Sequence, residues 1–412
     1  MNEVLDIKSF GPLKEAHIVF NRITAFIGEQ GTGKSSIAKI YSLFCWLEKA
    51  LSRHQFSITY LQQYSRFRKN FCSYNNLTAL FHEDTYLHYV GLVYDFEYQD
   101  EHLSITPLKN SHVGNAKVMY VPAERTILGC VDHTSKLKGI PAPLTTFAEE
   151  FDTAKAMLRT YRLPFDDVKL TYDKLNDIPW IQGKSFKVRL SEASSGYQSA
   201  SSLLMVSKYL SSFVLDSKQK SSLDMADQKK MQKEVENIMS SHYSDTVKEA
   251  MLHQLSNQFA YTHFVNVVEE MELNLFPTSQ EKVLYELLAD TNSGQDNRLV
   301  LTTHSPYVIN YLTLAVKAKQ VYDKAANADV EWVATGNVRQ AISAIVPKES
   351  FVDPSSLVIY QIAEGRASKL DTYDGLPTDA NALNEQLMVT NDHFDGLLDI
   401  EEEVEHEGNW FF

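Results

Sequence analysis

Runs of apolar, largely β-branched residues recur along the chain and predict strands that are buried on both faces. They are RITAFI (22–27), AKVMYVPAER (116–125), YTHFVNVVEE (261–270) and RLVLTT (298–303). Between these runs, apolar residues return at helical spacing, as in residues 35–47 and 231–259. Strands that alternate with helices and carry no polar face indicate an α/β fold with a mostly parallel sheet.

Two segments carry local signals of a different kind. Residues 126–185 are interrupted by prolines, and we expect irregular structure with short helices there. Thr278 and Glu281 have the spacing of a capping box and predict the start of a helix.

Charge is distributed unevenly along the 412 residues, whose formal net charge is −14. Residues 370–412 contain 12 Asp or Glu and no Lys or Arg, so the preceding residues carry a net charge of only −2. A nearly neutral body gives no positive support for a nucleic-acid surface, although it leaves a local basic groove open. The acidic tail is either a solvated terminus or a docking segment for a basic partner.

Composition excludes several classes of protein. The chain has no apolar run of 18 residues, and its first residues, MNEVLDIKSF, lack the pattern of a signal peptide. Its three cysteines, Cys45, Cys72 and Cys130, form no CxxC pair and cannot all be paired with one another. We therefore expect a cytoplasmic protein that is not embedded in a membrane.

A phosphate-binding loop follows the first of the predicted buried strands. The sequence matches G-x-x-x-x-G-K-[ST], and its candidate binding residues are Gly28, Glu29, Gln30, Gly31, Thr32, Gly33, Lys34, Ser35 and Ser36. Glycines allow backbone N–H groups to converge on an anion, Lys34 would reach the phosphates, and Ser35 would bind Mg²⁺. A helix predicted from Ser35 would direct its N-terminus at the phosphates. The loop predicts nucleotide binding.

Two further motifs end buried strands and predict the hydrolytic groups. Glu269 and Glu270 close the strand 261–270, at the edge where a doubly wound sheet binds ligands. One carboxylate, Glu269, would support the metal, and the other, Glu270, would orient and deprotonate the attacking water. His304 follows the next strand, where a neutral imidazole could reach the γ-phosphate or that water. The non-catalytic alternatives are a solvated acidic turn for the two glutamates and a structural role for His304.

The stretch LSEASSGYQSASSLL (190–204) offers a second anion site. Ser195 and Gly196 precede small residues that lead into a helix, and a hydroxyl with helix N-terminal N–H groups can bind an anion. Because the phosphate loop already serves this chain's own nucleotide, a second site suggests the nucleotide of a partner copy. In isolation the motif also fits a polar turn that caps a helix.

In their order and wording these motifs resemble the ABC-type ATPase superfamily. SFGPLKEA, ITAFIGEQGTGKSSIAK, SSGYQS, VVEEMELNLFP and LTTHSPYVI are similar to its RecF/OLD-like branch, which includes ATPase subunits of bacterial anti-phage systems such as Septu. The resemblance implies an α/β, ABC-ATPase-like head with a mostly parallel sheet, helical insertions and a small C-terminal α+β extension. The head would span 1–345, with insertions at about 52–185 and 211–260, and the extension with its acidic tail would span 346–412.

The resemblance also implies roles and partners. Lys34 and Ser35 would bind the phosphates and Mg²⁺ of ATP, Glu269 would support the metal, Glu270 would be the catalytic base and His304 the switch. Ser195 would reach across a homodimer to the other copy's γ-phosphate. Hydrolysis in such a homodimer, or in a higher oligomer, would control an effector protein such as a nuclease or toxin.

Departures from the family pattern leave the proposed catalytic groups in place. Glu269 stands where most ABC proteins have Asp, Met271 replaces the usual Pro, and Phe276 replaces a frequent His. The loop expected to carry Gln after the strand 116–121 contains Glu124 and Arg125 instead, so these two stand where the family has its Gln.

Alternatives within the superfamily can be ranked by spacing. Ser195 and Glu270 are 75 residues apart, about three times the separation in the transporter pattern, which argues against a transporter ATPase. The residues between Lys34 and Ser195 lack sustained heptads, which excludes the long coiled-coil arms of structural-maintenance proteins. The main alternative is a DNA-binding repair clamp of the RecF kind. It draws on YSRFRKNFCSY (64–74), whose basic residues alternate with aromatic ones, although a solvated basic loop would read the same.

Overall fold

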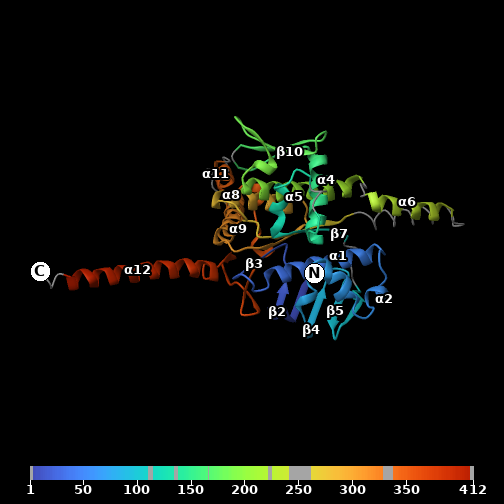
Figure 1. Ribbon diagram of the computed structural model, residues 1–412, viewed down its shortest axis with the longest axis horizontal. Coiled ribbons are helices and arrows are strands. Elements are labelled where there is room, and N and C mark those ends of the chain that lie inside the picture. The colour runs from blue at the N-terminus through green and yellow to red at the C-terminus, as the bar shows by residue number, and fades with distance from the viewer. Residues whose placement is uncertain are drawn as a thin grey trace.

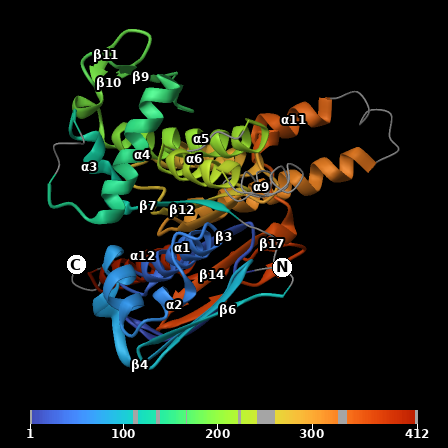
Figure 2. The same ribbon diagram turned by 90° about the vertical axis from the view of Figure 1, so that its right-hand side faces the viewer.

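An eleven-stranded sheet runs through the molecule and carries helices on both faces (Figures 1 and 2). The computed structural model describes residues 3–109, 115–133, 138–165, 167–220, 225–240, 261–327 and 337–408. The strand order is β6-β5-β4-β1-β2-β15-β14-β3-β13-β12-β7. The strands are β1 (Val4–Phe10), β2 (Leu13–Val19), β3 (Ile23–Ile27), β4 (Phe81–Val90), β5 (Tyr94–Gln99), β6 (His102–Pro107), β7 (Ala116–Val121), β12 (His263–Glu269), β13 (Arg298–Thr302), β14 (Leu357–Ala363) and β15 (Arg366–Lys369).

One half of this sheet is parallel and contains all four strands predicted from the sequence. β14, β3, β13, β12 and β7 run side by side in the same direction. Every residue of β3 and of β12 is buried, which accounts for their continuous apolar sequence. The α/β class is confirmed, and β13 lies between the strand of the phosphate loop and the strand of the paired carboxylates.

The other half is antiparallel, so the complete sheet is mixed. β1 pairs with β2 and β4, and β5 lies between β4 and β6. β5 and β6 are joined by Asp100 and Glu101, whose φ angles of 51° and 59° are those of a two-residue hairpin turn. The turn forms without Gly or Asn at these positions, and the sequence pattern therefore gave little sign of it.

Helices and sheet together enclose two apolar cores. The helices are α1 (Lys34–Ser52), α2 (Ile58–Leu61), α3 (Thr126–Gly129), α4 (Ala142–Leu158), α5 (Ser195–Lys220), α6 (Met225–Ser240), α8 (Pro277–Asn292), α9 (Pro306–Asn327), α11 (Asn337–Ile345) and α12 (Ala382–Gly408). α1 lies between the parallel and antiparallel halves, and its residues share a core with both (Figure 2). α4, α5, α8 and α9 cover the opposite face of the parallel half.

One local expectation was wrong, and a second, the helix that starts near Thr278, was confirmed as α8 but with a different cap. Residues 126–185 contain the 17-residue helix α4 and most of a second sheet, formed by β8 (Thr160–Arg162), β9 (Lys169–Asp173), β10 (Ile178–Gln182) and β11 (Lys187–Arg189). Pro141 caps α4 and Pro143 lies in its first turn, where proline is tolerated because that N–H needs no helical partner. α8 begins at Pro277 with Phe276 as its cap, so Thr278 caps nothing.

The predicted insertion and extension are both continuous with the head. α5 runs from the Ser195 motif to Lys220, and α6 follows it, whereas residues 241–260 of the expected helical stripe lie outside the described residues. β14 and β15, from the predicted extension, lie inside the main sheet between β3 and β2. The hairpin of β16 (Thr372–Tyr373) and β17 (Leu376–Pro377) then leads to α12. Among the described residues, no helix has the length and apolar character needed to cross a bilayer.

Candidate functional site

The phosphate loop joins β3 to α1 and has the backbone shape that an anion cradle needs. Gly28, Gly31 and Gly33 have φ angles of 144°, 76° and 109°, which L side chains rarely adopt. At Gly28 there is also no room, because an added Cβ would lie 2.3 Å from the carbonyl oxygen of Ile362. All three glycines are therefore favoured by conformation, and Gly28 is required by its contact with β14 as well.

Lys34 folds back over this loop. Its Nζ donates hydrogen bonds to the carbonyl oxygens of Gly28 at 2.8 Å and Glu29 at 2.6 Å. The side chain is buried, and burial lowers its pKa although four nearby carboxylates oppose the shift. Ser35 is exposed in the first turn of α1, and Ser36 is half-buried. An incoming phosphate oxygen could replace the carbonyl groups as acceptors of the Lys34 N–H bonds.

The paired carboxylates occupy different environments. Glu269 ends β12 with only 4% of its surface exposed, and its Oε1 has no hydrogen-bond partner in the described structure. Glu270 leaves the strand with φ +43°, donates its N–H to the Thr302 carbonyl oxygen at 2.9 Å, and has a 35% exposed side chain. The geometry thus separates a buried oxygen that lacks a partner from a carboxylate accessible to water.

Arg125 holds the turn between them. Its Nη1 donates to the Glu269 carbonyl oxygen and its Nη2 to the Glu270 carbonyl oxygen, both at 2.7 Å. The guanidinium is fully buried, and this burial lowers the pKa of Arg125 to about 10, so it remains charged at neutral pH. Arg125 is therefore a positioning residue, whereas its neighbour Glu124 is exposed.

His304 lies where β13 brings the carboxylate turn and the loop together. Thr303 donates its N–H to the Phe26 carbonyl oxygen at 3.0 Å, and His304 Nε2 lies 3.9 Å from Glu270 Oε1. Burial and the Lys34 cation lower the pKa of His304, so the neutral imidazole is favoured at neutral pH.

Glu272 is a site residue that the sequence reasoning missed. Its Oε1 accepts the backbone N–H of His304 at 2.7 Å, and burial raises its pKa. It fixes the loop that carries His304 to the turn that carries Glu270. The available signal was a third acidic residue in EEMEL two positions after the pair, which resembled ordinary turn composition.

A cavity of about 430 Å³ opens beside the loop. It is lined by Gly28, Glu29, Gln30, His304, Ala382, Leu383 and Gln386. The first four come from predicted site motifs, and the last three belong to the first turns of α12. No pattern in the sequence indicates that α12 would begin at this cavity.

The Ser195 motif lies on another part of the molecule. Ser195 is exposed at the start of α5, and α1 and α5 cover opposite faces of the parallel half-sheet. A Cβ on Gly196 would lie 2.9 Å from the Asn274 carbonyl oxygen, and Gln198 is buried and donates to the carbonyl oxygens of Leu190 and Ser191. The fold thus gathers the loop, Glu269, Glu270 and His304 at one edge of the sheet, whereas Ser195 is exposed at the start of α5, on the face of the sheet opposite α1.

The gathered residues fit a magnesium nucleotide. A buried carboxylate oxygen without a partner, a hydroxyl at a helix start and a buried lysine beside backbone N–H groups are the donors that Mg²⁺ and phosphates require. Ser35 and Glu269 would hold the metal, and phosphate oxygens and water would complete its shell. Among the described residues, no group of three or more His, Cys, Asp or Glu side chains is arranged to hold a metal ion.

The basic segment 64–74 is largely engaged in the fold. Arg68 pairs with Glu101 at 2.8 Å, Arg66 stacks on Tyr60 with its guanidinium 3.9 Å from the ring centre, and Phe67 is buried. A stacking platform for bases needs free aromatic faces beside free cations. Two of the three basic residues are engaged within the fold, whereas Lys69 and Tyr64, which is 72% exposed, remain accessible, so the segment offers only part of such a platform.

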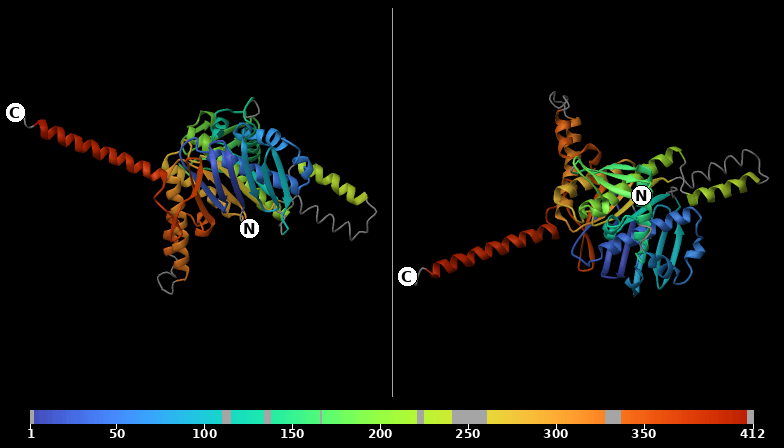
Figure 3. Two further views of the ribbon diagram at one scale, coloured as in Figure 1. Left: turned by 90° about the horizontal axis from the view of Figure 1, so that it is seen from below. Right: turned by 45° about the horizontal axis from the view of Figure 1, so that its top comes forward.

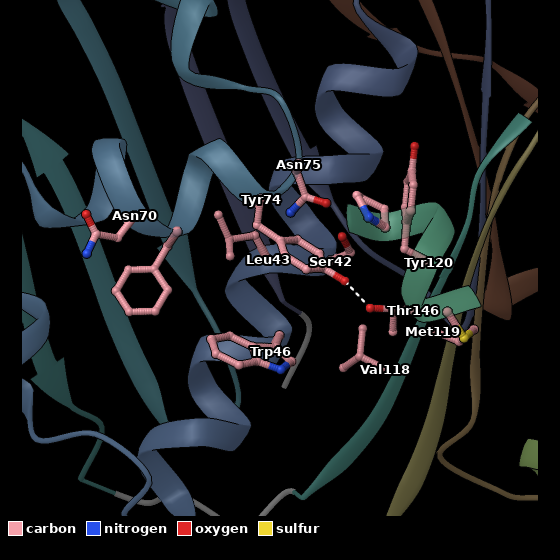
Figure 4. A pocket seen from close by; sticks show the side chains of 12 residues that line it. Ser42, Leu43, Trp46, Asn70, Tyr74, Asn75, Val118, Met119, Tyr120 and Thr146 are labelled. Carbon is pink, nitrogen blue, oxygen red and sulfur yellow. Dashed lines mark hydrogen bonds between the residues drawn. The ribbon is translucent and has the colours of Figure 1, made fainter. Parts of the chain in front are cut away.

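A second, mainly apolar cavity of about 360 Å³ lies between α1, β7, α4 and residues 70–75 (Figure 4). The hydrogen bond between the hydroxyls of Tyr74 and Thr146 borders it. Tyr120 also lines it, and burial, with the Glu269 carboxylate as a further cause, raises the Tyr120 pKa well above its usual value. The cavity therefore shares one wall residue with the surroundings of the carboxylate site.

Comparison with known proteins gives structural similarity only. No family model and no curated protein matches the chain. Similar solved structures include the SMC head domain from Thermotoga maritima, at 11% identity over 90% of this chain and 99% of that one, with a TM-score of 0.36. The Smc head from Pyrococcus furiosus, bound to the C-terminal domain of ScpA, is 8% identical over 96% and 99%, with a TM-score of 0.36. A dimeric ATP-binding cassette bound to ADP and Pi is 9% identical over 90% and 100%, with a TM-score of 0.29.

Proposed function

We propose that this protein is a Mg²⁺-dependent ATPase that acts as a switch. The observation that carries the proposal is the meeting of three strand ends. β3 supplies the phosphate loop, β12 supplies Glu269 and Glu270, and β13 between them supplies His304. Hydrolysis of ATP to ADP and phosphate needs charge neutralisation and a positioned water, and these residues provide both.

Each side chain has a distinct role in this proposal. Lys34 exchanges its carbonyl acceptors for β- and γ-phosphate oxygens, and bound Mg²⁺, held by Ser35 and Glu269, supplies charge neutralisation. Glu270, accessible to water and 3.9 Å from His304, accepts the proton of the attacking water. His304, neutral at pH 7, hydrogen-bonds the γ-phosphate or that water and so reports which nucleotide is bound.

Two copies would complete the site. Ser195 begins a 26-residue helix, is exposed, and lies on the face of the sheet opposite α1. Its exposure on that face supports a role at the nucleotide of another molecule. We infer a homodimer in which each ATP lies between Lys34 of one copy and Ser195 of the other.

The resemblance to RecF/OLD-like ATPases extends the proposal to a biological setting. In that setting the ATP-dependent dimer controls an effector such as a nuclease or toxin of a bacterial defence system, in the cytoplasm. Support comes from the quoted motifs, whereas two of the three basic residues on which the DNA-clamp alternative draws, Arg66 and Arg68, are engaged within the fold.

The test is the solution mass of Glu270→Gln, measured by light scattering after gel filtration with and without Mg-ATP. Removing the base while keeping the loop should trap the closed dimer, so the mass should double with ATP and revert when Ser195→Arg is added. Glu124→Gln, which neutralises an exposed carboxylate near the same edge, is the control and should show no trapping. A Glu270→Gln protein that stays monomeric in Mg-ATP would refute the composite site.

A further inference from the structure

α12 leaves the body of the molecule as a long amphipathic helix (Figures 1 and 3). Four of its acidic residues, Asp392, Asp395, Asp399 and Glu402, recur at intervals of three and four and so share one face, whereas Glu401 lies on the other half. The opposite half of the helix carries apolar side chains that are 40–64% exposed, namely Val389, Phe394, Leu397, Leu398 and Ile400. Apolar side chains clustered in this way on a protruding helix are typical of an interaction surface.

The root of α12, residues 381–386, consists of Asn381 and the first turns of the helix and lies beside the phosphate loop. Asn381 is buried, and its Oδ1 accepts the N–H groups of Leu383 and Asn384, both at 3.2 Å. The N–H of Ala382 donates to Gln361 Oε1 on β14, the strand next to β3. Leu383 and Gln386 line the same cavity as Gly28 and His304. Whatever fills that cavity touches the base of the exposed helix.

We propose that α12 is the docking element for a different protein, whose surface offers an apolar groove bordered by Lys and Arg. An amphipathic helix binds by laying its apolar face into such a groove. Basic residues on the rim are required because residues 370–412 contain 12 carboxylates and no Lys or Arg. The docking rests on α12 alone, and its coupling to nucleotide rests on the proposed ATPase function.

Charge distinguishes this partner from two other occupants. Two α12 helices packed through their apolar faces would bring two segments that carry no Lys or Arg within about 10 Å of each other, with Glu401 of each helix on the side of the seam, and this like-charge repulsion costs free energy. A membrane surface rich in anionic lipid would repel the same carboxylates, whereas interfacial helices that bind membranes usually carry Lys and Arg on their polar face.

The test compares two positions of equal exposure on the full-length chain. Leu397 on the apolar face and Met388 on the acidic face are each 64% exposed. A photo-crosslinking amino acid, p-benzoylphenylalanine, is placed at position 397 or at position 388 in cells of the native host. The protein captured only through position 397 is then purified, and its affinity for the wild-type chain, Leu397→Asp and Met388→Asp is measured.

The proposal predicts about a tenfold or larger loss of affinity for Leu397→Asp and a change within about twofold for Met388→Asp. It also predicts weaker binding as salt rises from about 0.1 to about 0.5 M. A product at position 397 that is a second copy of this chain or a lipid would overturn it. So would the absence of a product specific to position 397, or equal effects of the two substitutions.

The same binding measurement on Glu270→Gln separates this inference from the proposed function. If docking requires Leu397 and changes with Mg-ATP, both stand. If docking requires Leu397 but is indifferent to Mg-ATP while the nucleotide-dependent dimer forms, the helix docks and the coupling through its root is wrong. If no dimer forms and docking still requires Leu397, the ATPase switch fails and the docking surface remains.

Discussion

Replacing Arg125 by Met should separate catalysis from nucleotide binding. The guanidinium is fully buried and donates to the carbonyl oxygens of Glu269 and Glu270 at 2.7 Å each. It therefore sets the position of both carboxylates without touching the phosphate loop. Met has a similar length and no donor, so the substitution removes the hydrogen bonds while largely avoiding a cavity.

The size of the effect follows from these contacts. A hydrogen bond from a charged donor contributes about 1.5–3 kcal/mol, and two short ones are lost here together with a longer one, from Nη1 to the Pro122 carbonyl oxygen at 3.3 Å. Removing the buried cation offsets part of this loss of stability, because the desolvation of a charge no longer opposes folding. We expect Arg125→Met to lower the free energy of unfolding by about 2–4 kcal/mol. Arg125→Lys should lose about half as much, since one ammonium group cannot span both carbonyls in the same geometry.

Urea unfolding, steady-state ATP hydrolysis and Mg-ADP binding should be measured together. kcat should fall by more than about tenfold, because the Glu270 carboxylate is no longer held where it accepts the proton of the attacking water. The affinity for Mg-ADP should change by less than about threefold. A folded Arg125→Met protein with wild-type kcat would refute the assigned positioning role. So would a loss of Mg-ADP binding as large as the loss of kcat.

Two further predictions concern the loop and the core beneath it. Gly28→Ala should lower the free energy of unfolding by about 3 kcal/mol and abolish nucleotide binding, because the added Cβ would lie 2.3 Å from the Ile362 carbonyl oxygen. Gly31 faces open space, so Gly31→Ala should lower the free energy of unfolding by only about 1 kcal/mol, through backbone strain. If the two substitutions had equal effects in calorimetry and in nucleotide titration, the contact between Gly28 and Ile362 would not be the cause. Burial raises the pKa of Glu48 from 4.5 to about 7, so the folded protein binds a proton between these values and its stability should fall by about 3 kcal/mol as pH rises through that window. Glu48→Gln keeps an acceptor for the Val93 N–H and should flatten the stability profile between pH 5 and 8; an unchanged profile would refute the assignment.

The sequence was most informative where local pattern and function coincide. The phosphate loop, both glutamates and His304 each end a continuous apolar run, and such runs report burial on both faces directly. Strand direction then brings the three ends to one edge. This part of the site could be predicted because its geometry follows from strand type and order alone.

The missed features depend on contacts between distant segments. Glu272 matters because its carboxylate meets the His304 backbone, 32 positions away, and Arg125 matters because it reaches the carbonyls of β12. The insertion of β14 beside β3 and the approach of α12 to the phosphate loop join the last residues to the first. None of these contacts leaves a periodicity or motif in a single sequence.

The most direct test of the central claim is ATP hydrolysis by a mixture of Lys34→Ala and Ser195→Arg proteins. If each site combines Lys34 of one copy with Ser195 of the other, both variants are inactive alone, whereas a mixed dimer contains one intact site. An equimolar mixture should then recover about a quarter of wild-type activity, since half of the dimers are mixed and each has one of two sites. A mixture that stays inactive, although differently tagged copies co-purify in Mg-ATP, would contradict the shared site.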